Sequence, residues 1–332
     1  MQSIIYDFIS IIHALFYADT LVILGVSGGI LIPFVKLFTR KKIIVNIDGL
    51  EWRRGKWSKP VKKFLKFSER MAVRFSDADI TDNLSIQRYT AINYKTLSHL
   101  IEYGGDHTST QKLTSEDYRA YPFLRKPYAF KVCRIEPENN VHLILDAFSA
   151  IKNKTLVIVG NWENSEYGIG LKKQYHHTTN LHLLDPIYDQ KALDKIRSHC
   201  YVYVHGHSAG GTNPSLVEAM YLKLPVIAFN VSYNIATTEN KAFFFSNKEE
   251  LILLLEEKKI EDYQDNSSEM KSIAERRYTW SVIAQKYANL IHCFDYNYSK
   301  KSVWAKTTDF NHAWLLKKGM GHLKKPIPFY EY

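Results

Sequence analysis

Short apolar runs alternate with segments of helical periodicity along most of the chain, and this alternation constrains the fold more than any other feature. The apolar runs that predict buried strands lie at 20–24, 43–47, 78–81, 96–101, 128–133, 155–160, 181–184, 200–204 and 226–229. The segments that predict helices lie at 4–16, 58–75, 84–91, 141–151, 190–198, 214–222 and 279–294, with a further helix ending at 38. Strands that alternate with helices in this way favour parallel, doubly wound sheets. The predicted fold class is therefore α/β.

The chain has 332 residues, which is enough for two domains that each bury a core. A glycine-containing segment, 103–107, ends the first series of strands and helices, and a polar loop follows it to about residue 125. We therefore expect a first domain at 1–104 and a second at 105–295. The segment 296–332 reads as a basic, aromatic tail.

The formal net charge of +10 implies an acidic partner. Basic residues concentrate between 53 and 74, where tryptophan and phenylalanine side chains are interleaved with them. No recognised nucleic-acid fold accompanies them, so nucleic acid is not the expected partner. An anionic membrane attracts such a face at about 1 kcal/mol per basic residue, with Lys62, Lys63 and Lys66 facing the lipid. The alternative is an ordinary solvated helix face.

Other features bear on compartment. No stretch reaches the roughly 18 apolar residues of a membrane-spanning helix, and the apolar N-terminus lacks the basic region and cleavage site of a signal peptide. Three cysteines, Cys133, Cys200 and Cys293, are too few and too far apart for a disulfide framework. These features favour a reducing cytoplasm.

The most informative local motif is the strand, glycine loop and helix at 200–222. Gly210 and Gly211 allow the backbone to approach a ligand closely. Asn213 suits a helix N-cap and Pro214 the first helical position. Because the free N–H groups and the positive dipole end of a helix start favour an anion, the motif predicts a phosphate site. The alternative is an ordinary capped turn.

Several segments together resemble one family. Residues 101–106 are similar to an "NGVD" interdomain linker, and residues 133–141 are similar to a "GRLxPEKG" motif. The other matching segments are 156–160, 218–220 together with 224–228, and 278–281. They resemble the nucleotide-sugar domain of the two-Rossmann (GT-B) glycosyltransferases, particularly the large retaining family 4. The segments 46–52 and 210–216 resemble a branch of bacterial polysaccharide enzymes that includes rhamnosyltransferases.

The resemblance implies two Rossmann-like domains that face each other across a cleft. It also implies transfer of a sugar, with retention, from a nucleotide-diphosphate donor to a polyprenyl-diphosphate-linked glycan at the cytoplasmic face of the plasma membrane. The product would be a surface polysaccharide or O-antigen intermediate. The family needs no metal or cofactor, and the Gly28-Gly29 turn lacks the spacing of a dinucleotide site.

Glu218 matches the family glutamate that accepts hydrogen bonds from the ribose hydroxyls, a role that suits a carboxylate. The alternative is a capping box with Ser215, but Pro214 at the first helical position places Glu218 too deep in the helix. The other family glutamate falls at Gly210 and is absent. Thr212, Asn213 and the loop N–H groups would then have to hold the sugar and the phosphate.

Arg134 matches the family arginine on the diphosphate, where a guanidinium stabilises charge that develops as the leaving group departs. The alternative for this residue is a surface salt bridge. The companion lysine of the family falls at Asn139, so Lys131 or another base would have to replace it. His205 and its neighbour His207 would either donate to phosphate or serve as polar loop residues.

Asp48 follows a predicted strand, where many family members carry a histidine near the reacting sugar. Its carboxylate would orient the acceptor hydroxyl or act as a base, although Asp-Gly is also a common turn. Asp77 and Asp79 resemble a metal-binding DxD motif but are interpreted as structural. The chain also begins downstream of the strand and glycine loop that open the family's first domain, which leaves an inactive nucleotide-sugar-binding or interaction protein as the rival interpretation.

Overall fold

The computed structural model describes residues 2–55, 57–294 and 300. The chain divides into two compact units. Among the described residues, unit 1 contains 2–102 without residue 56, Ala209–Gly211, and 284–294 with Lys300, and unit 2 contains Tyr103–Ser208 and Thr212–Ile283. The predicted tail, 296–332, lies outside the described residues apart from Lys300.

The C-terminal limit of the second domain differs from the expected 295. Helix α13 (Trp280–Cys293) begins in unit 2, but its residues from Ala284 onward group with unit 1. A buried ion pair between the Lys286 ammonium and the Glu102 carboxylate holds this part of the helix within unit 1. The helical periodicity predicted α13 but gave no indication of which core it joins.

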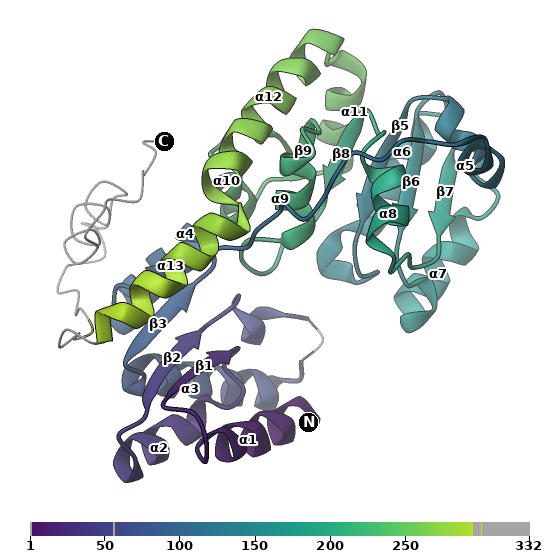
Figure 1. Cartoon of the computed structure of the whole chain (residues 1–332). Coiled ribbons are helices and arrows are strands. Elements are labelled where there is room, and N and C mark those ends of the chain that lie inside the picture. Colours follow the sequence, from purple (N-terminus) through teal and green to yellow (C-terminus); the bar gives the residue numbers. More distant parts are fainter. Residues whose placement is uncertain (1, 56, 295–299, 301–332) are drawn as a thin grey trace. The chain divides into compact units, whose positions relative to one another are not determined.

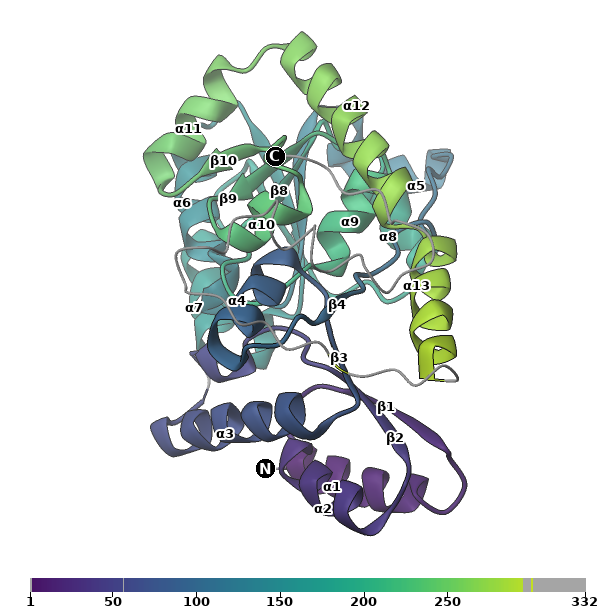
Figure 2. The same ribbon diagram turned by 90° about the vertical axis from the view of Figure 1, so that its left-hand side faces the viewer.

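Unit 1 is built on a four-stranded parallel sheet with the order β1-β2-β3-β4. Its strands are β1 (Thr20–Leu24), β2 (Lys42–Asn46), β3 (Ala78–Thr81) and β4 (His99–Leu100). Its helices before the linker are α1 (Gln2–Ala14), α2 (Ile32–Phe38), α3 (Lys59–Phe75) and α4 (Leu84–Tyr94), with short 3-10 turns at Gly29–Leu31 and Glu51–Arg53. Buried residues of α1, α2 and α3 share one cluster with β1 and β2, which places these helices on one face of the sheet (Figure 2).

Unit 2 is built on a six-stranded parallel sheet with the order β10-β9-β8-β5-β6-β7 (Figure 1). The strands are β5 (Tyr128–Val132), β6 (Thr155–Val159), β7 (Leu181–Leu184), β8 (Val202–His205), β9 (Val226–Phe229) and β10 (Phe243–Phe245). The chain builds outward from β5 to β7, then returns to pair β8 with β5 and builds outward in the other direction. The strand order therefore reverses between β5 and β8.

Two apolar clusters cover the two faces of this sheet. One contains buried residues of α8 (Gln190–Arg197), α9 (Pro214–Tyr221) and α12 (Ile260–Arg277). The other contains buried residues of α6 (Val141–Ala150), α7 (Glu166–Tyr175) and α11 (Lys248–Glu257). The remaining helices are α5 (Ser115–Ala120) and α10 (Ser232–Thr237), with 3-10 turns at Pro122–Arg125, Pro137–Asn139 and Trp162–Asn164. Because both faces are covered, the strands are mostly apolar, as expected for a parallel sheet, with Lys131 in β5, His182 in β7 and His205 in β8 as the charged or titratable exceptions.

The structure corrects several element predictions. The strand expected at 96–101 shrinks to the two residues of β4. Strand β10 and helices α7, α11 and α12 were not predicted. The last of these has a largely polar sequence that buries only a narrow stripe, including Met270, Ile273 and Ala274. A narrow stripe gives a weak periodic signal, whereas a three-residue strand gives almost none.

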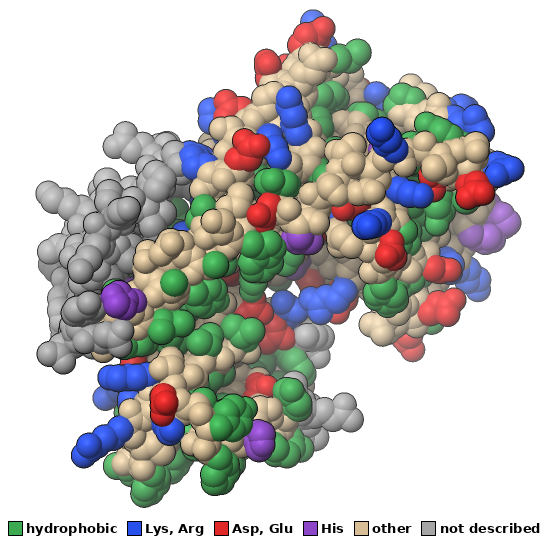
Figure 3. Space-filling model, in the orientation of Figure 1, with side chains coloured by type: hydrophobic (Ala, Val, Ile, Leu, Met, Phe, Trp, Pro, Cys, Tyr) green, Lys and Arg blue, Asp and Glu red, His purple; other side chains and the backbone are tan. Residues whose placement is uncertain are grey.

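Part of the unit 1 surface is apolar. Figure 3 shows hydrophobic side chains on the surface of the part of the molecule that carries α1 and α2. Exposed residues there include Tyr6, Ile9, Phe16, Phe34 and Phe38. In the described part of the chain no helix combines the length and apolar character that a membrane crossing requires.

Two glycines of α7 provide a matched test of the packing. A Cβ at Gly168 would lie 2.3 Å from the Trp162 carbonyl oxygen, whereas a Cβ at Gly170 meets nothing within 4 Å. We expect Gly168→Ala to lower the free energy of unfolding by about 1–3 kcal/mol because the backbone must move. Gly170→Ala should be neutral or stabilise by up to about 1 kcal/mol. Urea unfolding of both variants measures this, and equal effects would contradict the packing of α7.

Candidate donor site at the strand-order reversal

The ends of β5 and β8 bring two predicted site segments together. Arg134 follows β5 and the glycine loop follows β8, and these two strands are neighbours in the sheet. Ligands of open α/β sheets bind outside the carboxyl ends of the strands, at the point where the strand order reverses. The loop also contacts the segment after β5 directly, since the Ser208 N–H and hydroxyl both donate to the Glu138 carbonyl, at 2.8 and 2.9 Å.

Asn139 joins these two segments at the position where the family pattern has a lysine. Its amide nitrogen donates to the Arg134 carbonyl at 2.8 Å. Its oxygen therefore faces Nδ1 of His207 at 3.0 Å, so this ring nitrogen carries the proton and donates. Both Asn139 and His207 are buried. The amide supplies a fixed link between the two loops in place of a positive charge.

The start of α9 is built as the sequence indicated. Asn213 is the N-cap and its side chain accepts from the Ser215 N–H at 3.0 Å, with Pro214 in the first turn. Thr212 is 4% exposed. Gly210 adopts φ 141°, a backbone conformation that favours glycine. The three residues Ala209–Gly211 group with unit 1, although the loop on both sides of them belongs to unit 2.

Glu218 is fixed by a buried cation that the sequence did not reveal. The Arg197 guanidinium, which is 0% exposed, forms an ion pair with one oxygen of Glu218 and a second ion pair with Asp194 at 2.5 Å. Burial alone would lower the pKa of Arg197, but the two carboxylates outweigh it and raise the pKa. Arg197 therefore stays charged and orients the Glu218 side chain.

The second oxygen of Glu218 lies 2.9 Å from Nε2 of His107. The other ring nitrogen of His107 accepts from the indole N–H of Trp280 at 3.2 Å. The histidine is therefore held as the tautomer that donates from Nε2 to the carboxylate. Each oxygen of a carboxylate has about two acceptor positions, so Glu218 can still accept from ligand hydroxyls while it is held by both neighbours.

Arg134 and Lys131 differ in their solvent exposure. The Arg134 side chain is 58% exposed and lies 3.7 Å from Glu136. An exposed pair at this distance contributes little to stability, so the guanidinium can exchange it for a bound anion. Lys131 lies within β5, is 1% exposed, and burial lowers its pKa. It does not reach the surface beside Arg134, so the structure gives no support to Lys131 as a replacement for the family lysine.

His205 lies in β8 and not in the loop that follows it, which corrects its predicted position. It is 2% exposed and pairs with Ala228 of β9 in the ladder. Neither ring nitrogen has a hydrogen-bond partner among the described residues. Burial, with Lys131 and His207 nearby, brings the pKa of His205 well below its usual range. A neutral ring under the loop is poorly placed to contact a phosphate in solvent.

Asp48 lies in unit 1 and is exposed, directly after the buried Ile47. Its φ is 56°, a left-handed conformation that aspartate tolerates, and its N–H donates to the Asn46 side chain at 3.0 Å. Asp48 and Glu51 line a cavity of about 280 Å³ at the carboxyl ends of β1 and β2, together with Ser27. This end of a parallel sheet is a common place for ligand binding.

Asp77 and Asp79 are occupied by structural contacts. Asp77 pairs with Lys36 at 2.9 Å and accepts from the Ile43 N–H at 2.8 Å. Asp79 is buried, accepts from the Ser98 hydroxyl and pairs with Lys300 at 2.6 Å. Among residues 2–55, 57–294 and 300, no group of three histidine, cysteine or acidic side chains is arranged for a metal ion.

The three lysines predicted to face a membrane lie on α3. Lys63 and Lys66 are exposed, whereas Lys62 is half-buried. The Lys66 ammonium lies 4.5 Å from the centroid of the Trp52 ring. Sequence reasoning placed these residues on one helix, but did not predict this contact with Trp52.

Comparison with known structures identifies the fold. HepE from Anabaena in complex with UDP-glucose has a TM-score of 0.72 at 15% identity, covering 86% of this chain and 81% of that chain. Sucrose-phosphate synthase from Thermosynechococcus elongatus has a TM-score of 0.70 at 15% identity, covering 86% and 76%. Trehalose 6-phosphate synthase from Burkholderia multivorans has a TM-score of 0.65 at 11% identity, covering 83% and 72%. The chain has the GT-B glycosyltransferase fold, as the sequence predicted.

Family comparison assigns the two parts of the chain. Residues 116–277 match the family "Glycosyl transferases group 1", so unit 2 carries a glycosyltransferase group 1 domain. Residues 1–106 match "Domain of unknown function (DUF1972)". A comparison with curated protein sequences gave no significant match.

The Arg197 ion pairs can be tested by stability. Arg197→Leu leaves two carboxylates without their buried cation, so we expect a loss of about 3–5 kcal/mol in the free energy of unfolding. The double variant Arg197→Leu with Glu218→Leu should recover part of this loss, because one of the two stranded charges is removed. His107→Gln, which keeps both ion pairs, is the control and should change stability little. Urea unfolding measures all three, and a near-neutral Arg197→Leu would contradict the arrangement.

Proposed function

We propose that the chain transfers a sugar from a nucleotide-diphosphate donor to a growing glycan. The single observation that carries the proposal is the Glu218 carboxylate, held by buried Arg197 and by His107 at the strand-order reversal of a glycosyltransferase group 1 domain. A carboxylate fixed in this way is prepared to accept hydrogen bonds from the two hydroxyls of a ribose without losing side-chain entropy on binding.

In this proposal the diphosphate lies over the start of α9. The Arg134 guanidinium and the N–H groups of the loop before Pro214 balance the charge that builds up as the nucleoside diphosphate leaves. Thr212 and Asn213 border the donor sugar at the position where the family glutamate is replaced by Gly210. Asn139 and His207 hold the two loops in place, with His205 beneath them as support. The crystallised HepE complexes with UDP and UDP-glucose support a donor of this class.

The finer assignments follow from the resemblance. We propose rhamnose as the sugar, transfer with retention, and a lipid-linked intermediate of a surface polysaccharide or O-antigen as the acceptor. Asp48, which lines the unit 1 cavity, would orient the acceptor hydroxyl or take its proton. Retention would proceed by front-face attack while the departing diphosphate takes part in proton removal. No step requires a metal or cofactor.

The ribose assignment predicts a selective loss of affinity. Hydrogen bonds to a charged group contribute about 1.5–3 kcal/mol, so Glu218→Ala should weaken binding of UDP by about tenfold to a hundredfold. Inorganic pyrophosphate has no ribose, so its affinity should change little. Isothermal titration of the full chain measures both, with Glu257→Ala, an exposed glutamate of α11, as the control. If Glu218→Ala lost equal affinity for the nucleotide and for pyrophosphate, the proposed contact between Glu218 and the ribose would be wrong.

Turnover separates the proposal from its rival. Donor hydrolysis or sugar transfer by the purified chain, lost in Glu218→Ala and retained in Glu257→Ala, would support the enzyme. Nucleotide binding without any turnover would instead favour a protein that binds nucleotide sugar without transferring it.

We further propose that α3 rests on an anionic membrane surface through Lys62, Lys63 and Lys66, on the cytoplasmic side. Each basic residue near such a surface contributes about 1 kcal/mol, so changing all three to glutamate should abolish flotation with vesicles that contain anionic lipid. The control changes Lys112, Lys152 and Lys191, exposed residues of unit 2, to glutamate. Equal flotation of the two triple variants would refute the assignment of this surface.

A further inference from the structure

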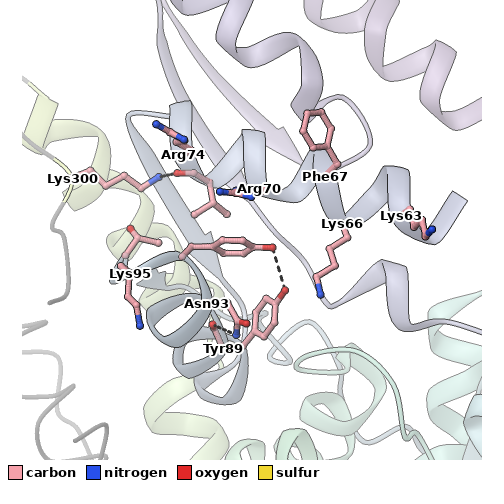
Figure 4. A pocket seen from close by; sticks show the side chains of 12 residues that line it. Lys63, Lys66, Phe67, Arg70, Arg74, Tyr89, Asn93, Lys95 and Lys300 are labelled. Atoms are coloured by element: carbon pink, nitrogen blue, oxygen red, sulfur yellow. Dashed lines mark hydrogen bonds between the residues drawn. The ribbon is translucent and has the colours of Figure 1, made fainter. Parts of the chain in front are cut away.

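A second basic site lies within unit 1, between α3 and α4. It is a cavity of about 870 Å³, with a volume in the range of small-molecule sites. Figure 4 shows α3 contributing Lys63, Lys66, Phe67, Arg70 and Arg74, with Tyr89 and Asn93 contributed by α4 and Lys95 just after it. No site assigned above uses this cavity, although two of the proposed membrane lysines lie at its wall.

The lining of the cavity is strongly cationic. None of the described residues that line it is acidic, and six are lysine or arginine. These six are Lys63, Lys66, Arg70, Arg74, Lys95 and Lys300. Four of them follow one another on α3 at spacings of three or four residues, which places them on one side of the helix. The positive charge is therefore concentrated along one wall.

The nearby carboxylates do not neutralise this wall. Glu69 is buried and accepts hydrogen bonds from the hydroxyls of Tyr89, at 2.7 Å, and Tyr94, and both tyrosines line the cavity whereas Glu69 does not. Burial raises the pKa of Glu69, against the lowering effects of these hydroxyls, of the Trp52 side chain and of the positive charge of Lys66. Asp79 is also buried, and Lys300 is committed to it.

Five cations remain at the cavity wall. Within the described part of the chain, none of Lys63, Lys66, Arg70, Arg74 and Lys95 forms an ion pair with a carboxylate. Like charges gathered on a concave surface with low-dielectric walls repel one another and focus a positive potential into the cavity. A multivalent anion would relieve that repulsion.

We propose that this cavity binds a diphosphate group. Two arginines one helical turn apart suit bidentate contacts with phosphate oxygens, and the lysines add point charges around them. A diphosphate fills only part of the volume of the cavity. The half-exposed ring of Phe67 offers an apolar neighbour for a group attached to the diphosphate. The source is either a soluble diphosphate or the headgroup of a lipid diphosphate. The lipid source rests on the proposed function, in which the acceptor is lipid-linked.

Titration of the full chain with inorganic pyrophosphate tests the site. The variant Arg70→Gln, Arg74→Gln, Lys95→Gln removes three cations without touching the lysines assigned to the membrane surface. The control Lys112→Gln, Lys152→Gln, Lys191→Gln removes the same charge from exposed positions of unit 2. We expect the cavity variant to lose at least one pyrophosphate-binding event, or at least tenfold in affinity, and the control to match the unaltered chain. Equal binding by the two triple variants would overturn the proposal.

Circular dichroism and thermal unfolding establish that both variants fold. A second pair, Arg70→Lys and Arg70→Gln, keeps the test decisive if the triple variant does not fold. Arg70→Lys retains the charge and should bind pyrophosphate more tightly than Arg70→Gln. Equal affinities in these two variants would count against the site.

Vesicles distinguish the two sources. Phosphatidylcholine vesicles that carry a polyprenyl diphosphate are compared with the same vesicles carrying the uncharged polyprenol. Recruitment by the diphosphate alone, reversed by pyrophosphate and lost in the cavity variant, identifies the lipid headgroup. Pyrophosphate binding without recruitment identifies a soluble source, and both results support the site.

The outcome is separable from that of the proposed function. In the proposed function, binding of UDP at the donor site depends on Glu218, and the cavity variant leaves that residue intact. If sugar transfer is absent while the cavity variant alone loses pyrophosphate, the proposed function fails and the site stands. If transfer is present and neither triple variant loses pyrophosphate, the site fails and the function stands.

Discussion

The buried guanidinium of Arg197 is the interaction on which the candidate donor site depends. It lies at the end of α8 and pairs with Asp194 one turn earlier and with Glu218 on α9. Asp194 in turn accepts from the Ser109 N–H at 3.1 Å, and His107 reaches the other oxygen of Glu218. One cation without solvent exposure therefore fixes two helices and the segment after residue 102 in a single network. Networks of this kind are costly when incomplete, so they specify one arrangement.

The same network explains how a helix of eight residues can present a precise carboxylate. Helix α9 begins at a capped turn, where Asn213 occupies the N-cap, and Glu218 lies on its next turn. Its neighbours Leu216, Val217, Ala219 and Met220 are fully buried, which fixes the rotation of the helix about its axis. Packing therefore sets the direction of the side chain, and Arg197 and His107 set its final position. The Glu218 side chain is therefore held in one position without any ligand.

The fold class and the start of α9 could be predicted from residues that are close together in sequence. The alternation of strands and helices indicated the fold class, and the pair Asn213-Pro214 indicated the start of α9, because both signals depend on residues close together in sequence. Arg197 could not be found this way. On its own helix it resembles an exposed cation in the last turn, and its burial depends on Glu218, 21 residues later. The contact of Glu218 with His107 spans 111 residues, which no local pattern encodes. His205 was placed in a loop because the ladder that extends β8 to include it depends on β9.

Unit 1 is discontinuous in sequence, and this has a consequence for how the protein is made. Apart from three loop residues, unit 2 is one continuous stretch, whereas unit 1 also contains residues 284–294 and Lys300. Two of its buried carboxylates, Glu102 and Asp79, are paired with Lys286 and Lys300 from that later segment. In a chain emerging from the ribosome, Glu102 and Asp79 are therefore made before the two lysines that form ion pairs with them. All six strands of the second sheet precede these lysines in the chain, so unit 2 can be completed before unit 1, although most of unit 1 precedes it in sequence.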